Sequence, residues 1–229
     1  EAGAIRCEGT EEMFDLARIF SWENAPKGPK IAIISNAGGP AVISVDALEK
    51  EGLQLASFNQ ITRKNLQRIL PRAASVLNPV DILGDALADR YDQAISQVLS
   101  DKNVDALIII LTPQIMTEVE ATAEVIGRLA AKYRQPVVCS FMGGNLVDKG
   151  EELLDRYKIP SFRFPERAVK ALARMWEWRL KVPARHARPL AGIAGRKSSK
   201  LKVKSLAKVK LLTKNTVNKI SKITKLAKN

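Results

Sequence analysis

The chain has 229 residues, of which 46% are hydrophobic and 5% are aromatic, enough to form one sizeable hydrophobic core. This composition excludes collagen-like, mucin-like and wholly disordered proteins. The longest apolar run, residues 106–111, is far shorter than the roughly 18 residues that a membrane span requires, so we expect no membrane span.

The net charge of +13 is concentrated in the last part of the sequence. Residues 1–178 hold 21 basic and 24 acidic residues, which gives them a net charge of −3. Residues 179–229 hold the other 16 basic residues and no acidic one. The positive charge is therefore a property of a Lys-rich tail and not of the folded part.

The cysteine and histidine content argues against a metal site or a disulfide framework. Cys7 and Cys139 lie far apart without CxxC spacing, and His186, the only histidine, lies in the tail. We expect two free thiols in a reducing cytoplasm. No basic segment followed by an apolar one opens the chain, so we expect no signal peptide and a cytoplasmic location.

The first half of the sequence alternates between helix and strand patterns. Thr10 is predicted to cap a first helix, which the Pro-rich segment 26–29 ends. The elements expected next are a strand at 31–35, a helix at 39–52, a strand at 53–56 and a short helix that Thr62 caps and that ends near Pro71. A loop around residues 78–81 then leads into a helix at 89–100.

The second half begins with the strongest signal for a buried strand, at residues 104–111. It is followed by a helix at 118–133, a strand at 136–140, a helix at 146–157, a short strand near Phe162 and a helix at 166–178. Apolar strands that alternate with helices predict a parallel sheet covered on both faces. About five strands in about 150 residues match a flavodoxin-like, doubly wound α/β fold.

The tail differs in character from the rest of the chain. Residues 183–199 are typical of a linker, because they mix Pro, Gly, Arg and Ser. Beyond them, apolar residues recur every three to five positions among lysines, which predicts a disordered segment or an amphipathic basic helix. Such a tail could contact polyanions or a membrane surface, or it could be a tether to another domain or a nonnative extension.

Two predicted strand ends carry paired glycines. Asn36, Ala37, Gly38 and Gly39 follow the first strand, and Gly143 and Gly144 follow the strand at 136–140. Glycines let the backbone approach an oxyanion, and the free N–H groups of a following helix attract it. Neither segment fits GxGxxG or a P-loop, so the pattern predicts an anion site and not a dinucleotide site.

Other candidate residues have ordinary structural interpretations. Asn78 and Asp81 flank Pro79 in a predicted strand-end loop, where such side chains more often bond backbone groups than perform acid–base work. Trp176 and Trp178 are predicted to pack in a core or interface. No catalytic set that uses histidine is available in residues 1–178.

Five segments in combination carry a family resemblance. They are IAIISNAGGPAVISVDALEKEGL, NPVDILGDA, VDALIIILTP, PVVCSFMGGN and KIPSFRFPERAVKAL. With them, residues 1–178 resemble the NDP-forming acyl-CoA synthetases, whose best-known members are ADP-forming acetate–CoA ligases. Residues 28–178 are similar to the succinyl-CoA ligase-like flavodoxin domain of the alpha subunit or region, residues 1–27 look like the end of the preceding domain and a linker, and residues 179–229 form the tail.

The resemblance implies a reversible reaction of acyl-CoA, phosphate and ADP to give acid, CoA and ATP. An acyl phosphate forms, and its phosphoryl group passes to a histidine that then moves to a nucleotide site. In such enzymes two opposed helices aim their N-termini at the phosphohistidine. By resemblance, the helix that begins at Gly39, led by Asn36, Ala37 and Gly38, is the second of these.

Several parts of such an enzyme are absent from these residues. The CoA-binding domain, the histidine-bearing loop and the ATP-grasp domain or subunit are expected as partners, and CoA, ADP or ATP, and Mg are expected in the complete enzyme. We expect this chain to bind no cofactor alone and to be inactive alone. Two alternatives are a silent synthetase-like regulatory region of a protein lysine acetyltransferase and a noncatalytic α/β module whose tail binds polyanions.

Overall fold

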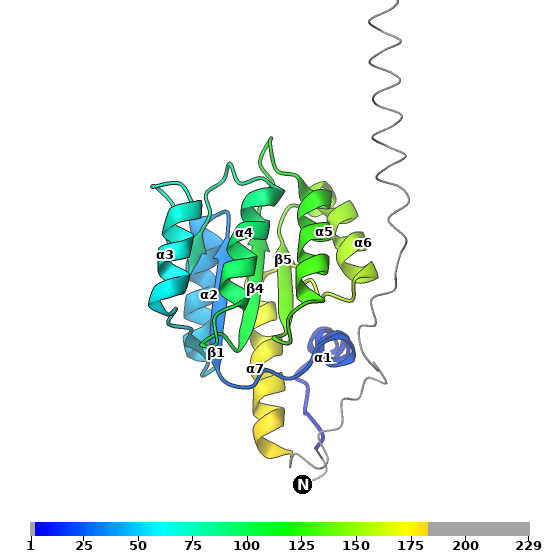
Figure 1. The fold of residues 1–229 in the computed structure, drawn as a ribbon. Coiled ribbons are helices and arrows are strands. Elements are labelled where there is room, and N and C mark those ends of the chain that lie inside the picture. The colour runs from blue at the N-terminus through cyan, green and yellow to red at the C-terminus, as the bar shows by residue number, and fades with distance from the viewer. Residues whose placement is uncertain (1–2, 183–229) are drawn as a thin grey trace, which may run out of the picture. The chain divides into compact units, whose positions relative to one another are not determined.

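The computed structural model describes residues 3–182, which form a parallel sheet with helices on both faces (Figure 1). The strands are β1 (Lys30–Ser35), β2 (Gln54–Leu55), β3 (Val80–Asp81), β4 (Ala106–Leu111) and β5 (Val137–Phe141). The helices are α1 (Thr10–Trp22), α2 (Gly38–Lys50), α3 (Gln60–Ile69), α4 (Ala88–Leu99), α5 (Val119–Ala130), α6 (Asp148–Arg156) and α7 (Pro165–Lys181), with a 3-10 turn η1 (Gly144–Leu146).

The sheet has the doubly wound topology that the sequence predicts. Its strand order is β2-β1-β4-β5, and every pair is parallel. β3 pairs with the carboxyl half of β1, where Ser35 lies opposite Asp81, while β2 pairs with the amino half, where Lys30 lies opposite Gln54. From β1 the chain passes to β2 and β3 on one side of β1 and then crosses to β4 on its other side, so the topological switch point lies between β1 and β4.

The core has two layers because the central strands are buried on both faces. Leu107, Ile109 and Leu111 of β4 belong to one apolar cluster, which includes residues of α3, α4, α5 and α6. Ile108 and Ile110 belong to the other, which includes residues of α1, α2 and α7. Burial on both sides explains why β4 is a continuous apolar run and not an alternating one.

The count of five strands is confirmed, but one member of the set differs from the prediction. Residues 80–81, expected in a loop, form β3. The strand expected near Phe162 is only an isolated bridge between Cys139 and Ser161. Pro160 has no N–H to extend that ladder, and α7 begins soon afterwards with Pro165 at its first position.

Several helix boundaries also differ from the expected ones. α3 is capped by Asn59, whose side chain accepts a hydrogen bond from the Thr62 N–H at 2.9 Å, so the expected Thr62 cap is wrong. Thr10 is the first residue of α1, and Gly9 takes the cap position without a side-chain bond. α7 continues to Lys181, so the predicted boundary between residues 178 and 179 falls within this helix.

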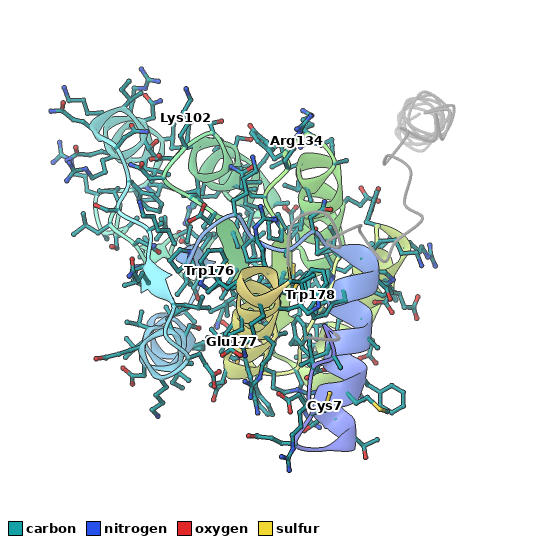
Figure 2. The ribbon with its side chains drawn as sticks, turned by 90° about the horizontal axis from the view of Figure 1, so that it is seen from below. Cys7, Lys102, Arg134, Trp176, Glu177 and Trp178 are labelled. Carbon is teal, nitrogen blue, oxygen red and sulfur yellow. The ribbon has the colours of Figure 1, made fainter. Side chains whose placement is uncertain are left out.

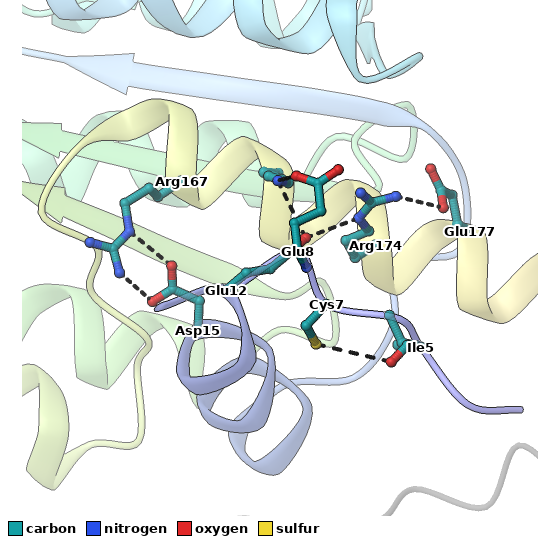
Figure 3. Close-up of polar contacts among 9 residues, drawn as sticks. Ile5, Cys7, Glu8, Glu12, Asp15, Arg167, Arg174 and Glu177 are labelled. Carbon is teal, nitrogen blue, oxygen red and sulfur yellow. Dashed lines mark hydrogen bonds and ion pairs between the residues drawn. The ribbon is translucent and has the colours of Figure 1, made fainter. Parts of the chain in front are cut away.

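α1 packs along α7 through a set of ion pairs (Figure 3). The Arg167 guanidinium donates two hydrogen bonds to the Asp15 carboxylate, both at 2.8 Å. Arg174 donates to Glu12 at 3.2 Å. The assignment of residues 1–27 to a preceding domain stays a prediction.

The two tryptophans of α7 contribute to this packing, as predicted. The Trp178 indole donates to the Gly3 carbonyl at 2.9 Å and meets the Phe20 ring edge-on, and Trp176 packs against the apolar cluster under α7. The predicted linker, the tail from residue 183 onward and His186 lie outside the described residues.

Candidate functional site

The sequence-predicted glycine loops meet at one edge of the sheet. Because all strands are parallel, the loops that follow β1, β3, β4 and β5 all leave from this edge, which we call the carboxyl edge. In a doubly wound sheet, ligands bind at this edge beside the switch point. Among the predicted site residues, only Asn78, which precedes β3, lies away from it.

The loop after β1 is held in place by two buried polar side chains. Ser35 accepts a hydrogen bond from the Ala37 N–H at 3.0 Å and donates to the Ala37 carbonyl at 2.7 Å. The Asn36 amide donates to the Thr112 carbonyl and accepts from the Thr112 N–H, both at 2.8 Å. Asn36 therefore connects the loops after β1 and β4 across the switch point, with Thr112 as a partner that the sequence did not identify.

The start of α2 presents unpaired backbone donors. The N–H groups of a first helical turn have no partner within the helix, and Pro40 has none to offer. In the described part of the chain, no hydrogen bond is recorded from the N–H groups of Gly38 and Gly39. These two groups, at the positive end of the helix dipole, can bind an oxyanion.

The fold itself does not require glycine at these two positions. A Cβ added at Gly39 would meet no atom within 4 Å, and one at Gly38 would meet only the Asp81 carboxylate, at 3.8 Å. Neither glycine has a positive φ. Their small size leaves the N–H groups open to an approaching group, which is what an anion site needs.

Asp81 places a negative charge beside this helix start. One of its oxygens accepts a hydrogen bond from the Leu83 N–H at 2.9 Å, and the other is the oxygen that lies close to Gly38. A carboxylate here weakens the binding of a bare dianion, but it can accept a hydrogen bond from a donor that arrives with the anion.

The second glycine pair has structural reasons of its own. A Cβ at Gly143 would lie 2.5 Å from Cγ of Pro113, and Gly144 has a φ of +53°, which favours glycine. The backbone of this loop is therefore explained by packing and by the turn at η1. That makes Gly143 and Gly144 a weaker anion-site candidate than Gly38 and Gly39.

Asn78 uses its side chain to join two strands. Its amide donates to the Ile31 carbonyl at 2.8 Å and to the Ala56 carbonyl at 3.0 Å, and its oxygen accepts from the Ile33 N–H at 2.9 Å. Its side chain thus bonds the β1 backbone at Ile31 and Ile33, where the pairing of β1 with β2 ends and its pairing with β3 is about to begin. The expected backbone-bonding role of this residue is confirmed.

Strongly buried titratable groups lie behind the carboxyl edge. Burial raises the pKa of the Tyr91 hydroxyl, which donates to the Ile110 carbonyl at 3.2 Å, and burial also raises the pKa of the Cys139 thiol. Both groups stay neutral at pH 7 and are closed to solvent, so neither is a nucleophile.

Cys7 and Cys139 are both free thiols. Residues 3–182 contain no group of His, Cys, Asp and Glu side chains placed to hold a metal ion.

Exposed apolar side chains lie on other loops of the carboxyl edge. Ile115 is fully exposed, Leu146 is 73% exposed, Met116 is about half exposed and Leu87 is 40% exposed. They lie on the loops after β4, β5 and β3. Such a group of side chains is typical of a surface that another part of a protein covers.

Within residues 3–182, no helix has the length and apolar character needed to cross a membrane.

Comparison with protein families gives a match over most of the described chain. A family profile described as a Ligase-CoA domain matches residues 31–186. Acetate–CoA ligase (ADP-forming) I of Archaeoglobus fulgidus is 38% identical over 174 residues, which are 76% of this chain and 24% of that protein. The 4-hydroxybutyrate–CoA ligase (ADP-forming) of Nitrosopumilus maritimus is 36% identical over 76% of this chain and 25% of its own length.

Solved structures agree with this match. A crystal structure from Pyrococcus horikoshii superposes with a TM-score of 0.74 at 36% identity, covering 79% of this chain and 42% of that one. The dinucleotide-forming acetyl-coenzyme A synthetase 1 of Ca. Korarchaeum cryptofilum, in complex with phosphate and ADP, gives 0.73 at 26% identity, covering 78% and 39%. The chain thus spans about a quarter to two fifths of the length of the relatives it matches.

Proposed function

Because the chain belongs to the Ligase-CoA domain family, we propose that it is the phosphate-facing flavodoxin-like part of an ADP-forming acyl-CoA synthetase. Such an enzyme interconverts acyl-CoA, ADP and phosphate with acid, CoA and ATP. The relatives named as ADP-forming acid–CoA ligases support this class of reaction. The observation that carries the proposal is the pair of unbonded N–H groups at Gly38 and Gly39, on the carboxyl edge beside the switch point.

In this proposal, the chain contributes binding and orientation, not a nucleophile. The N–H groups of Gly38 and Gly39 donate to the oxygens of a phosphoryl group carried by a histidine of another domain. Asn36 and Ser35 hold the loop that leads into these donors. The free oxygen of Asp81 accepts a hydrogen bond from the imidazole that carries the phosphoryl group.

The apolar side chains around this edge identify the surface that the partner covers. Ile115, Met116, Leu146 and Leu87 lie on loops at the same edge as the start of α2, and burying them removes apolar area from water. We assign this surface to the histidine-bearing domain. The CoA-binding domain and an ATP-grasp domain or subunit, with CoA, nucleotide and Mg, complete the enzyme.

A substitution of Gly38 by Glu in the complete enzyme tests this assignment. The new carboxylate would fill the open space at the helix start and repel the phosphoryl oxygens. We expect ATP formation from acyl-CoA, ADP and phosphate to fall by at least ~10²-fold, as when a preorganised oxyanion donor is lost. The phosphohistidine should also become less stable.

Gly9→Glu provides a matched control. Gly9 also lies at a helix start, and a Cβ there would meet no atom within 4 Å, but it belongs to α1, away from the carboxyl edge. We expect this variant to keep normal turnover. Circular dichroism establishes that both variants fold. Near-normal turnover of a folded Gly38→Glu enzyme contradicts the proposal, as does a complete protein without any phosphorylated histidine, which would favour the regulatory alternative.

A further inference from the structure

A pocket lies at the opposite edge of the sheet from Gly38. It has a volume of about 620 Å³ and opens below the amino ends of β1, β4 and β5. Its walls are the segment before β1, the loops that precede β4 and β5, and the last turn of α7. Figure 2 looks onto this edge and places Lys102 and Arg134 on neighbouring loops, beyond the ends of α4 and α5.

Positive charge converges on this pocket from four separate elements. Lys27, Lys102, Arg134 and Arg179 line it, against the single carboxylate of Asp105. That carboxylate is itself engaged, because it accepts a hydrogen bond from the Lys30 N–H at 3.1 Å. Within residues 3–182, no ion pair or hydrogen bond is recorded for any of the four cationic side chains.

Helix dipoles account for only part of this arrangement. Lys102, Arg134 and Arg179 lie at or after the C-terminal ends of α4, α5 and α7, where a cation is favourable. That effect fades within the last turn, and it does not require cations of different elements to share one cavity. Lys27 follows no such helix end closely, since α1 ends at Trp22. Four like charges without partners are therefore better explained by an anion that they bind together.

The remaining walls define the kind of anion. Ala25, Val104 and Pro136 supply apolar surface, and Asn24 and Gln135 supply amides. The Gln135 amide donates to the Leu99 carbonyl at 3.1 Å, which fixes this side chain at the wall. A volume of about 620 Å³ lies within the range of small-molecule pockets and exceeds what a single phosphate needs.

We propose that this pocket binds a small molecule of nucleotide size that carries two or more phosphate groups. The cations contact the phosphates, and the apolar wall and the amides contact the remainder of the ligand. The site is distinct from the start of α2, which lies at the other edge of the sheet. The inference rests on the pocket alone and does not depend on the proposed reaction.

Binding to the full 229-residue chain tests the site, with ATP and inorganic tripolyphosphate as probes in a calorimetric titration. The pocket variant is Lys102→Glu/Arg134→Glu, which reverses two exposed charges that make no recorded bond within residues 3–182. The matched control is Arg63→Glu/Lys64→Glu, which reverses two exposed charges of α3. Circular dichroism establishes folding.

We expect the unmodified chain and the control to bind one equivalent of ATP with equal affinity, and the pocket variant to bind at least tenfold more weakly. Tighter binding of ATP than of tripolyphosphate is expected, because the apolar wall and the amides contact the remainder of the ligand, whereas equal binding would contradict a ligand of nucleotide size. Equal affinity of the pocket variant and the unmodified chain would place the anion elsewhere in the chain and overturn the proposal. Absence of saturable binding overturns it as well.

Discussion

At the scale of the residue, Asn78 and Asp81 show how similar side chains in one loop divide between structure and function. All polar atoms of the Asn78 side chain bond backbone groups of β1 and of the segment after β2. Asp81 bonds one backbone N–H and leaves an oxygen beside Gly38. The sequence predicts a backbone role for both, because Asx side chains in turns bond nearby backbone groups. Only their position relative to α2 separates them.

The Asn78→Ala variant tests the structural assignment. It leaves the buried Ile33 N–H and the buried Ala56 carbonyl without this partner, whereas the Ile31 carbonyl keeps its hydrogen bond from the Ala56 N–H. Each unsatisfied buried group costs about 1–3 kcal/mol, so we expect the free energy of unfolding to fall by about 2–4 kcal/mol in urea titrations.

Asn103→Ala serves as the comparison, because the Asn103 amide makes one exposed bond, to the Ser57 carbonyl at 3.1 Å. We expect its cost to stay below about 1 kcal/mol. If the two variants are equally stable, the strand-joining role of Asn78 is wrong.

At the scale of the element, α1 is attached to α7 by charged contacts and to the sheet by apolar ones. Glu12 accepts hydrogen bonds from the Glu8 N–H and from Arg174, and these lower the pKa of its carboxyl group. A carboxyl group with a lowered pKa in the folded state stabilises the fold above its unfolded pKa. It loses that contribution as the pH falls through the folded value.

Glu12→Gln removes this charge, and we expect it to lower the free energy of unfolding by about 1–2 kcal/mol at pH 7. The difference from the unmodified chain should begin to shrink as the pH falls below about 5, where the unfolded carboxyl starts to bind a proton, and it should vanish once the pH is below the lowered pKa of the folded state, where both proteins are neutral at this position. Unfolding in urea at several pH values measures it.

Glu120→Gln is the matched control. Glu120 pairs with Lys149 at 3.6 Å on an exposed surface, and such pairs contribute little to stability. We expect a change within about 0.5 kcal/mol at every pH. A stability difference for Glu12→Gln that is constant between pH 7 and pH 3 would contradict the assignment of its effect to the ionised carboxylate.

At the scale of the whole molecule, the chain holds one part of the reaction that we propose. Its only histidine, His186, lies outside the described residues and away from the family segments that carry the resemblance. We therefore expect the isolated 229-residue chain to form no ATP from acetyl-CoA, ADP and phosphate. Incubation with acetyl phosphate or ATP, followed by acid-labile phosphate analysis, should find no phosphohistidine. Stoichiometric phosphorylation of His186 would show that the chain carries its own nucleophile.

Several features of this protein follow from the sequence by itself. Alternating apolar strands and helices predict the parallel, doubly wound sheet, because a strand buried on both faces has to be a continuous apolar run. Gly38 and Gly39 are likewise predicted to form an anion site from local sequence, because paired glycines before a helix let backbone N–H groups approach an oxyanion. The family segments indicate the family, which the matching Ligase-CoA domain shows over residues 31–186.

Other features were decided only by the tertiary structure, because they depend on contacts between segments far apart in the chain. Residues 80–81 become a strand since β1 offers them a free edge beside β2, and residue 161 forms only a bridge. Gly143 is required by Pro113, whereas Gly39 is required by no neighbour, and local sequence cannot distinguish the two. The cationic pocket is likewise invisible in sequence, because Lys27, Lys102, Arg134 and Arg179 are brought together only when parallel strands align their amino ends.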